Sequence, residues 1–285
     1  MKLVTFMGPG QAPLAGVVEA DQVFSLAPAG YGSALEVIEQ GEGAKARIAA
    51  YLKSAPRQAA IPLERAVLLA PLPRPPKFIC VGLNYRDHAA EAKMEIPAVP
   101  TIFSKFHNAV IGPGASIVLP KNSSKPDYEA EFAFVIGAGG RHIRPEDWPK
   151  HVWGYTCVND VSARDFQLAT SQWLMGKTFD TFAPMGPWIV SADEIADPHN
   201  LAISCTVNGE KLQNSNTREL IFGIGPLLEF LSSVMTLEPG DVVSTGTPAG
   251  VGFSHKPPKW LKPGDMVEVE IEGIGRRANP VIAEE

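Results

Sequence analysis

Three acidic residues in two apolar segments are the first candidates for chemistry in this sequence. In the run 128–136, the alternation of a strand places Glu129 and Glu131 side by side on one face. Two adjacent carboxylates at the border of a packed region cost free energy unless a cation neutralises them. Asp160 follows the apolar run 152–159 and offers a third carboxylate. The pattern permits a metal site, although on spacing alone a solvated strand edge, with Asp160 as a helix N-cap, is the favoured interpretation.

A ligand set of this kind would contain only oxygen atoms, which limits the ions it could hold. Carboxylate oxygens favour the hard cations Mg²⁺, Mn²⁺ and Ca²⁺ over zinc and copper. Three carboxylates would leave roughly three positions of an octahedron for water or substrate. Because open positions let an ion act on a bound molecule, a metal site here would have a catalytic layout.

A second candidate group lies in the run 84–93, whose apolar spacing predicts a helix. His88 and Glu91 are three residues apart in this run, which places them on one helix face within hydrogen-bonding range. A histidine held by a carboxylate can take up or release a proton near neutral pH. A solvated pair without a catalytic role fits the same spacing, and for an unidentified helix it is the favoured interpretation.

The composition excludes several classes of function. The chain has 285 residues, a formal net charge of −6 and 25 basic residues that are scattered along the sequence. Because a nucleic-acid surface needs clustered Lys and Arg, we expect no nucleic-acid partner. No apolar run approaches the roughly 20 residues of a membrane span, so we expect no membrane partner and a cytoplasmic protein. Cys80, Cys157 and Cys205 are far apart and are expected to be buried free thiols.

Gly and Pro divide the chain into short apolar runs and indicate three parts. Residues 1–70 predict a small N-terminal α+β domain with short strands and a helix over 34–52. The proline-rich stretch 71–76 is a stiff connector. Residues 77–285 predict a β-rich α+β domain rather than a doubly wound sheet. Its expected strands are 78–82, 101–106, 117–119, 129–136, 152–159, 188–190, 201–207, 241–245 and 266–271, and its expected helices are 84–93, 162–168 and 224–234.

Five ordered motifs from Lys77 onward resemble one known family. They are KFICVGLNYRDHAAEA, DYEAEFAFVIG, GYTCVNDVSARDFQ, GKTFDTFAPMGPW and DVVSTGTPAGVG. In this order they are similar to the fumarylacetoacetate hydrolase superfamily. The stretch IADPHNLAISCTVNGEKLQNSNTRELIF is particularly similar to the fumarylacetoacetate hydrolase domain-containing protein 2 subgroup and its bacterial relatives. The resemblance implies a rolled, mixed β-sandwich with a small N-terminal domain, normally as a homodimer.

The same resemblance implies roles for individual residues. It implies that Mg²⁺ or Mn²⁺, with Ca²⁺ as a further option, is held by Glu129, Glu131 and Asp160. It makes His88 and Glu91 a catalytic dyad. Lys177, which could otherwise be a surface lysine, would lie beside the metal and stabilise an enolate oxygen. The residues expected to bind the substrate are Arg164, Gln167 and Thr247.

The activity that the resemblance implies is directed at small 2-oxo acids. We expect metal-dependent hydrolysis of a carbon–carbon bond in a 2,4-dioxo acid, an acylpyruvate such as fumarylpyruvate or maleylpyruvate, as in aromatic catabolism. Decarboxylation of oxaloacetate or isomerisation of a 2-hydroxymuconate would use the same enolate-stabilising site. The shared motifs do not choose among these reactions. A non-catalytic scaffold that keeps the metal is the alternative from another class.

Overall fold

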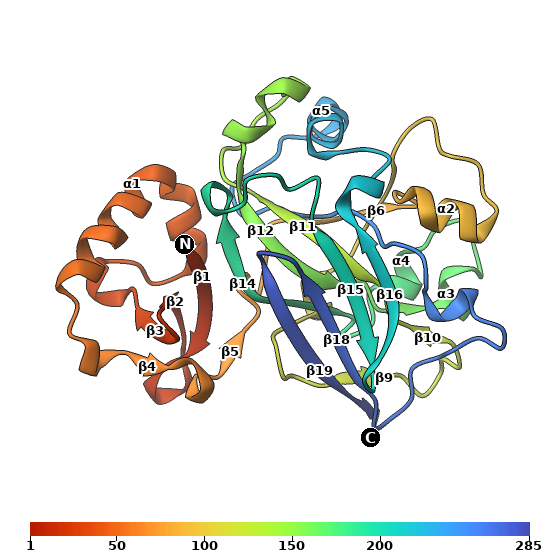
Figure 1. Ribbon diagram of the computed structural model, residues 1–285, viewed down its shortest axis with the longest axis horizontal. Helices are drawn as coiled ribbons and strands as arrows, with labels where there is room; N and C mark the ends of the chain where they lie inside the picture. The colour runs from red at the N-terminus through yellow and green to blue at the C-terminus, as the bar shows by residue number, and fades with distance from the viewer.

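The computed structural model describes residues 1–285, apart from the side chains of Pro9 and Ala59. It contains a large mixed sheet, a smaller sheet packed against it, and helices at the margins (Figure 1). In spatial order the large sheet contains β4 (Ile61–Pro62), β3 (Gln22–Ser25), β2 (Pro13–Glu19), β1 (Lys2–Met7), β14 (Ala183–Ser191), β12 (Val152–Asn159), β11 (Ala130–Ile136), β17 (Val242–Ser244), β6 (Phe78–Gly82) and β7 (Thr101–Ser104). Two short strands join it at the side, β5 (Leu68–Leu69) on β1 and β8 (Val110–Ile111) on β14.

The smaller sheet covers the middle of the large one. Its strands are β16 (Glu210–Asn216), β15 (Ala202–Val207), β18 (Met266–Ile271), β19 (Gly275–Ala283) and β9 (Ile117–Leu119). They pack across β11, β12 and β14 and enclose the main hydrophobic core. Both sheets contain parallel as well as antiparallel pairs. The β-rich α+β class and the mixed β-sandwich are confirmed.

β11 and β12 form the centre of the large sheet. Every residue of both strands is buried, and β11 lies between β12 and β17. A strand that is covered on both faces typically has a nearly continuous apolar sequence. The interpretation of 129–136 as a solvated strand edge is therefore wrong, and any charge on this strand lies inside the protein.

The helices are short outside the N-terminal region. They are α1 (Ala34–Ser54), α2 (Arg86–Ala92), α3 (Arg164–Gln167), α4 (Leu174–Lys177) and α5 (Ile224–Val234). The helix predicted over 162–168 is wrong at its start, because β13 (Ser162–Ala163) pairs there with β10 (Pro126–Asp127). None of the described helices combines the length and the apolar character needed to cross a membrane.

The N-terminal region shares the large sheet. β1 runs antiparallel to β14, with Lys2 opposite Val190 and Leu3 opposite Ile189. α1 packs on β1 and β2, and its first turn is capped by Ser33, whose hydroxyl accepts the Glu36 N–H at 3.2 Å. In Figure 1 this region, in red and orange, lies to one side of the sandwich. That residues 1–70 form a domain of their own stays a prediction.

Candidate metal centre and active site

The pairing of β11 with β12 brings the three predicted carboxylates together. Ala130 lies opposite Asn159, so Glu129 and Asp160 are neighbours just beyond the ends of their strands, and the Asp160 N–H donates to the Glu129 carbonyl at 2.9 Å. Glu131 is the second residue of β11. One carboxylate oxygen from each residue lies within 4.8 Å of the others, and no side chain of the three is more than slightly exposed. The predicted cluster is confirmed as a geometric unit.

Three basic side chains neutralise two of these carboxylates. Lys177 Nζ lies 2.5 Å from Glu129 Oε2 and 2.6 Å from Asp160 Oδ2. Arg164 approaches Glu129 Oε1 at 2.7 Å. Lys105, which the sequence analysis did not single out, lies 2.7 Å from Asp160 Oδ1. Lys177 therefore lies beside the carboxylate cluster, and its role beside a metal stays a prediction.

Glu131 is different, because no cation among the described side chains lies within 4.0 Å of it. Its Oε2 accepts hydrogen bonds from the Ser244 hydroxyl at 2.5 Å and from the Gly246 N–H at 3.1 Å. Burial and the nearby charges of Asp160 and Glu129 hold the pKa of Glu131 well above its usual range. An uncompensated carboxylate of this kind is costly inside a protein.

The pKa values of Glu129, Lys177 and Lys105 are shifted by burial and by the same charges. Burial alone would raise the pKa of Glu129, but the charges of Arg164 and Lys177 outweigh it and lower that pKa. Burial acts against the charged form of Lys177, yet Asp160 and Glu129 raise its pKa. Burial also lowers the pKa of Lys105, although the charge of Asp160 opposes that shift. The cluster holds Glu129 and Lys177 in their charged forms.

The charge balance indicates that a cation fits here. Asp127 is a fourth buried carboxylate and accepts from Arg164 Nε at 2.8 Å. If all four carboxylates were ionised, they would exceed the three buried basic groups of Lys105, Arg164 and Lys177 by one negative charge, and the raised pKa of Glu131 reflects the cost of that charge. A divalent ion would turn this deficit into a single positive charge, which a monocarboxylate ligand could neutralise. The donor set, all oxygen, suits Mg²⁺ or Mn²⁺.

A cavity of about 200 Å³ opens onto the carboxylates, and we call it the carboxylate pocket. Its lining also includes the apolar side chains of Phe103 and Trp173, whose rings meet edge to face at 5.5 Å. Gly82 makes room for these rings, because a Cβ there would lie 2.3 Å from the Trp173 ring. The pocket therefore combines charged and apolar lining residues, and Lys177 Nζ lies 4.9 Å from the centre of the Phe103 ring. Its full lining is Val81, Gly82, Leu83, His88, Ala92, Met94, Phe103, Glu129, Glu131, Asp160, Arg164, Gln167, Leu168, Trp173, Lys177, Thr247, Val251 and Phe253.

His88 reaches the same pocket from α2. Its Nδ1 lies 3.5 Å from Glu91 Oε2, as the spacing predicts, and this nitrogen has no closer partner among the described groups. Glu91 in turn accepts the Gly250 N–H at 3.1 Å. Burial would raise the pKa of Glu91, but the hydrogen bonds from His88 and Gly250 lower it. A carboxylate that stays ionised beside the imidazole can orient that ring.

Gly250 lies in the loop 245–252, and its hydrogen bond to Glu91 connects this loop to α2. Its φ is +99°, a left-handed conformation that favours glycine, and a Cβ there would lie 2.0 Å from the Leu212 carbonyl oxygen. The loop can therefore approach both Glu91 and β16 without a steric clash. The contact between His88 and Glu91 is confirmed, and their catalytic role stays a prediction.

The three residues predicted to bind substrate all line the pocket, but two of them also hold the protein together. Arg164 Nη1 donates to Gln167 Oε1 at 2.8 Å, while its other nitrogens face Asp127 and Glu129. The Thr247 hydroxyl donates to the Ala130 carbonyl at 2.9 Å and accepts from Gln213 at 2.8 Å. Among the described groups, the Gln167 amide NH₂ has no hydrogen-bond partner, whereas its oxygen accepts from Arg164. Substrate binding by these residues stays a prediction.

Sequence reasoning missed Lys105, Asp127 and Ser244. Lys105 stands in the apolar run Ile102-Phe103-Ser104-Lys105-Phe106, and a charged residue inside such a run is a signal of a buried ion pair. Asp127 and Ser244 carried no comparable signal, because turns and strand ends commonly contain these residue types.

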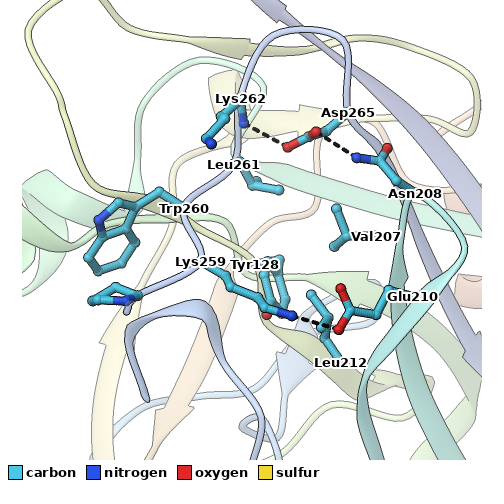
Figure 2. A pocket seen from close by; sticks show the side chains of 11 residues that line it. Tyr128, Val207, Asn208, Glu210, Leu212, Lys259, Trp260, Leu261, Lys262 and Asp265 are labelled. Atoms are coloured by element: carbon cyan, nitrogen blue, oxygen red, sulfur yellow. Dashed lines mark hydrogen bonds and ion pairs between the residues drawn. The ribbon is translucent and has the colours of Figure 1, made fainter. Parts of the chain in front are cut away.

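A wider pocket of about 440 Å³ lies at the loop 258–265 and the turn between β15 and β16 (Figure 2). It contains one ion pair and one side-chain hydrogen bond between its lining residues. Lys259 Nζ lies 2.6 Å from Glu210 Oε1, and the Asn208 amide donates to Asp265 at 2.7 Å. Tyr128 lines it and donates its hydroxyl to the Gly250 carbonyl at 3.1 Å. We call it the wide pocket.

Comparisons with known proteins show which family the chain resembles in sequence and in fold. The family model described as fumarylacetoacetate (FAA) hydrolase C-terminal matches residues 77–282. Oxaloacetate tautomerase fahd2, mitochondrial, of Xenopus laevis is 48% identical over 249 residues, which cover 87% of this chain and 77% of the relative. Maleylpyruvate hydrolase from Sphingobium sp. SYK-6, solved with manganese(II) ion and pyruvate, is 32% identical with a TM-score of 0.85. The 5-carboxymethyl-2-hydroxymuconate delta-isomerase of Mycobacterium smegmatis is 35% identical with a TM-score of 0.80, and both structures align over 100% of each chain.

Proposed function

The chain belongs to the fumarylacetoacetate hydrolase family, and we propose that it catalyses the metal-dependent interconversion of the keto and enol forms of a 2-oxo acid such as oxaloacetate. The observation that carries this proposal is the arrangement of the carboxylate pocket. An uncompensated carboxylate cluster and an imidazole held by a carboxylate line the same small cavity. Enolisation needs both a stabiliser for negative oxygen and a base for a carbon-bound proton.

The carboxylates supply the first requirement. Glu129, Glu131 and Asp160 would hold the ion, and a hard divalent cation would supply Lewis-acid chemistry toward the 2-oxo group. Lys177 adds a fixed positive charge at the same end of the pocket, where oxygen becomes negative as the enolate forms. The Gln167 amide can donate a hydrogen bond to the substrate carboxylate.

His88 supplies the second requirement. In our proposal its imidazole removes a proton from C3 of the 2-oxo acid, and the electron pair moves onto the 2-oxygen. Returning that proton to the oxygen gives the enol, and returning it to carbon gives the keto acid. Glu91 keeps the ring oriented and stabilises the imidazolium that forms between the two transfers.

The names of relatives support this choice of substrate class. The Xenopus laevis relative is named an oxaloacetate tautomerase, and other vertebrate relatives at 46–52% identity carry the same name. The Sphingobium enzyme holds manganese and pyruvate, which is itself a 2-oxo acid. Tautomerisation, isomerisation and carbon–carbon hydrolysis share an enolate, so one site can serve each of them.

Hydrolysis of an acylpyruvate is the second candidate, and the apolar lining favours it. Phe103 and Trp173 line the same pocket as the cluster and could receive an acyl group longer than the C4 carboxylate of oxaloacetate. In this reaction His88 would instead deprotonate a water that attacks the 4-carbonyl. Cleavage would release a carboxylic acid and the enolate of pyruvate, which takes up a proton.

One panel of assays separates the two candidates. Purified protein with Mn²⁺ is mixed with the enol of oxaloacetate, with acetylpyruvate and with fumarylpyruvate, and the ultraviolet absorbance of each enol is followed. We expect rapid ketonisation of oxaloacetate. The variant His88→Ala should lower that rate by about 10²–10⁴-fold while leaving the Kd for Mn²⁺ unchanged.

His142→Ala is the matched control, because His142 is exposed and does not line the pocket. Cleavage of acetylpyruvate without ketonisation of oxaloacetate would favour the second candidate. Protein that binds Mn²⁺ but turns over none of the three substrates would defeat both. The homodimer and the cytoplasmic location remain expectations, and several vertebrate relatives are named as mitochondrial.

A further inference from the structure

Side chains take the place of a strand partner beside Ala130 of β11. β17 covers only the middle of β11, although beyond its end the Thr245 N–H still donates to the Phe132 carbonyl at 2.9 Å. Ala130, two residues earlier, directs its backbone groups to the same side of the strand. Gln213 Oε1 accepts the Ala130 N–H at 2.9 Å, and the Thr247 hydroxyl donates to the Ala130 carbonyl at 2.9 Å. The backbone of β11 is thus held at this point by one side chain from β16 and one from the loop 245–252.

Gln213 closes these contacts into a ring of hydrogen bonds. It is fully buried on β16 and does not line the carboxylate pocket. Its Nε2 donates to Thr247 Oγ1 at 2.8 Å and to the Pro248 carbonyl at 2.9 Å. The orientation of the amide is fixed, because the Ala130 N–H needs an acceptor and the Pro248 carbonyl needs a donor. The Thr247 hydroxyl accepts from the amide, so its single hydrogen is used on the Ala130 carbonyl.

We propose that Gln213 is a positioning residue of the active site, which acts through the backbone of Ala130 and does not touch the substrate. Ala130 lies between Glu129 and Glu131 in the sequence, so the ring holds the peptide groups that join these two residues. Their carboxylates keep the relative positions of the cluster only while this segment is fixed. The inference rests on the proposed function, since it concerns how the metal centre of that function is held in place.

Removal of the Gln213 amide would leave buried groups without partners. The Ala130 N–H and the Pro248 carbonyl would each lose a hydrogen bond, which is costly inside a protein. The segment around Ala130 is then expected to shift toward another partner, and Glu129 and Glu131 would shift with it. A metal site tolerates deviations of only about 0.2 Å in its ligand distances. Metal affinity should therefore fall although no carboxylate has been changed.

The test compares the wild type with Gln213→Met, which keeps the length of the side chain but has no amide. Titration calorimetry on the metal-stripped full chain measures the Kd for Mn²⁺. We expect this Kd to rise about tenfold, because removal of a group that orients metal ligands typically lowers affinity by about 10–100-fold. In the metal-free protein, the Ala130 amide proton should exchange with solvent at least about tenfold faster than in the wild type.

Thr217→Val is the matched control, because Thr217 also joins two backbone groups through a fully buried side chain. Its hydroxyl accepts the Leu201 N–H at 2.8 Å and donates to the Pro198 carbonyl at 2.9 Å, and it does not line the carboxylate pocket. This variant should lower the Tm, since two buried groups lose a partner, and it should keep the wild-type Kd for Mn²⁺.

A double variant tests whether Gln213 acts through the ring. Thr247→Val removes the other support of the Ala130 backbone, so it should also raise the Kd for Mn²⁺. Once one support is lost, the loss of the second should matter less. The rise in Kd of the double variant should therefore be at least about threefold smaller than the product of the two single rises.

The outcomes are distinct. A Gln213→Met variant with a lowered Tm and the wild-type Kd for Mn²⁺ would overturn the inference, and so would single effects that multiply fully in the double variant. If Gln213→Met does not fold, Gln213→Asn decides in the same way, because its amide is one methylene too short to reach all of its partners. Metal binding is read without turnover, so an inactive protein that shows the expected changes would defeat only the proposed reaction. A wild type that does not bind Mn²⁺ would defeat the metal centre and the inference with it.

Discussion

The carboxylate pocket and the wide pocket lie on opposite sides of one short segment, since Tyr128 lines the wide pocket and Glu129 lines the carboxylate pocket. The wide pocket has about twice the volume, yet its ion pair between Lys259 and Glu210 is half exposed. The smaller pocket contains buried charges that do not cancel. Uncompensated charge, rather than volume, therefore distinguishes the pocket that we propose as the site of the ion and the substrate.

The largest expected effect comes from removing the uncompensated charge. Glu131→Gln keeps the size of the side chain but takes away the negative charge that a cation would neutralise. We expect Mn²⁺ binding to be lost and turnover to fall at least about 10³-fold, the scale of a strong preorganised electrostatic contact. Calorimetry and the oxaloacetate assay measure the two effects.

Glu210→Gln is the matched control in the wide pocket, and it should change neither quantity. If Glu131→Gln still bound Mn²⁺ at the wild-type Kd, the contrast between the two pockets would have no functional meaning.

The second effect has opposite signs on binding and on turnover. Lys177 Nζ contacts one carboxylate oxygen of Glu129 and one of Asp160, two of the residues that would hold the metal. Lys177→Met removes a like charge beside the ion, so we expect the Kd for Mn²⁺ to fall about tenfold. The same change removes a stabiliser of the enolate oxygen, so turnover should fall about 10²–10³-fold. A variant that loses affinity and turnover together would contradict this assignment.

The third effect is a dependence on pH. The pKa of Glu131 is raised in the folded protein, so its contribution to stability is fully present below its ordinary pKa of about 4.5 and is lost as the pH rises through the raised value. Metal-free protein should lose stability over this window. The increase in Tm caused by Mn²⁺ should therefore grow as the pH is raised from about 5 to about 8.

Differential scanning calorimetry with and without Mn²⁺ measures this dependence. Glu131→Gln should remove the pH-dependent part of the loss in Tm of the metal-free protein. A wild-type Tm shift that is the same across this range would show that Glu131 is ionised throughout.

The smallest effect is expected in the wide pocket. Lys259 and Glu210 form an ion pair whose side chains are 40% and 65% exposed, and such pairs contribute little in water. Lys259→Met should change the free energy of unfolding by no more than about 0.5 kcal/mol and turnover by less than about twofold. A tenfold loss of activity would mean that this pocket also serves the reaction.

Much of the sandwich was predictable because apolar runs bounded by Gly and Pro are read directly from sequence. The ranges of β6, β9, β12, β18 and α5 agree with the prediction. β16 and β19 were missed, since β16 is the polar run EKLQNSN and β19 contains two arginines and a proline. Their strand structure comes from pairing with β15 and β18, which is a tertiary effect.

The site was predictable in part for the same reason. Strand alternation placed Glu129 and Glu131 together, but it gave the wrong environment, because burial of β11 depends on β17, which lies over one hundred residues away. Lys105 and Asp127 reach the cluster only through contacts between residues far apart in the sequence. The spacing of residues along the chain does not predict such contacts. Distant pairings of this kind are the part that single-sequence reasoning does not supply.

The pairing of β1 with β14 has a consequence for solubility. Lys2 and Leu3 cover the backbone of Val190 and Ile189 at a margin of the sandwich. Without the N-terminal strands, this end of β14 would present free N–H and C=O groups on an apolar strand, which is a template for association with other chains. We therefore expect the N-terminal strands to protect the protein against aggregation. This role does not depend on any contact with the carboxylate pocket.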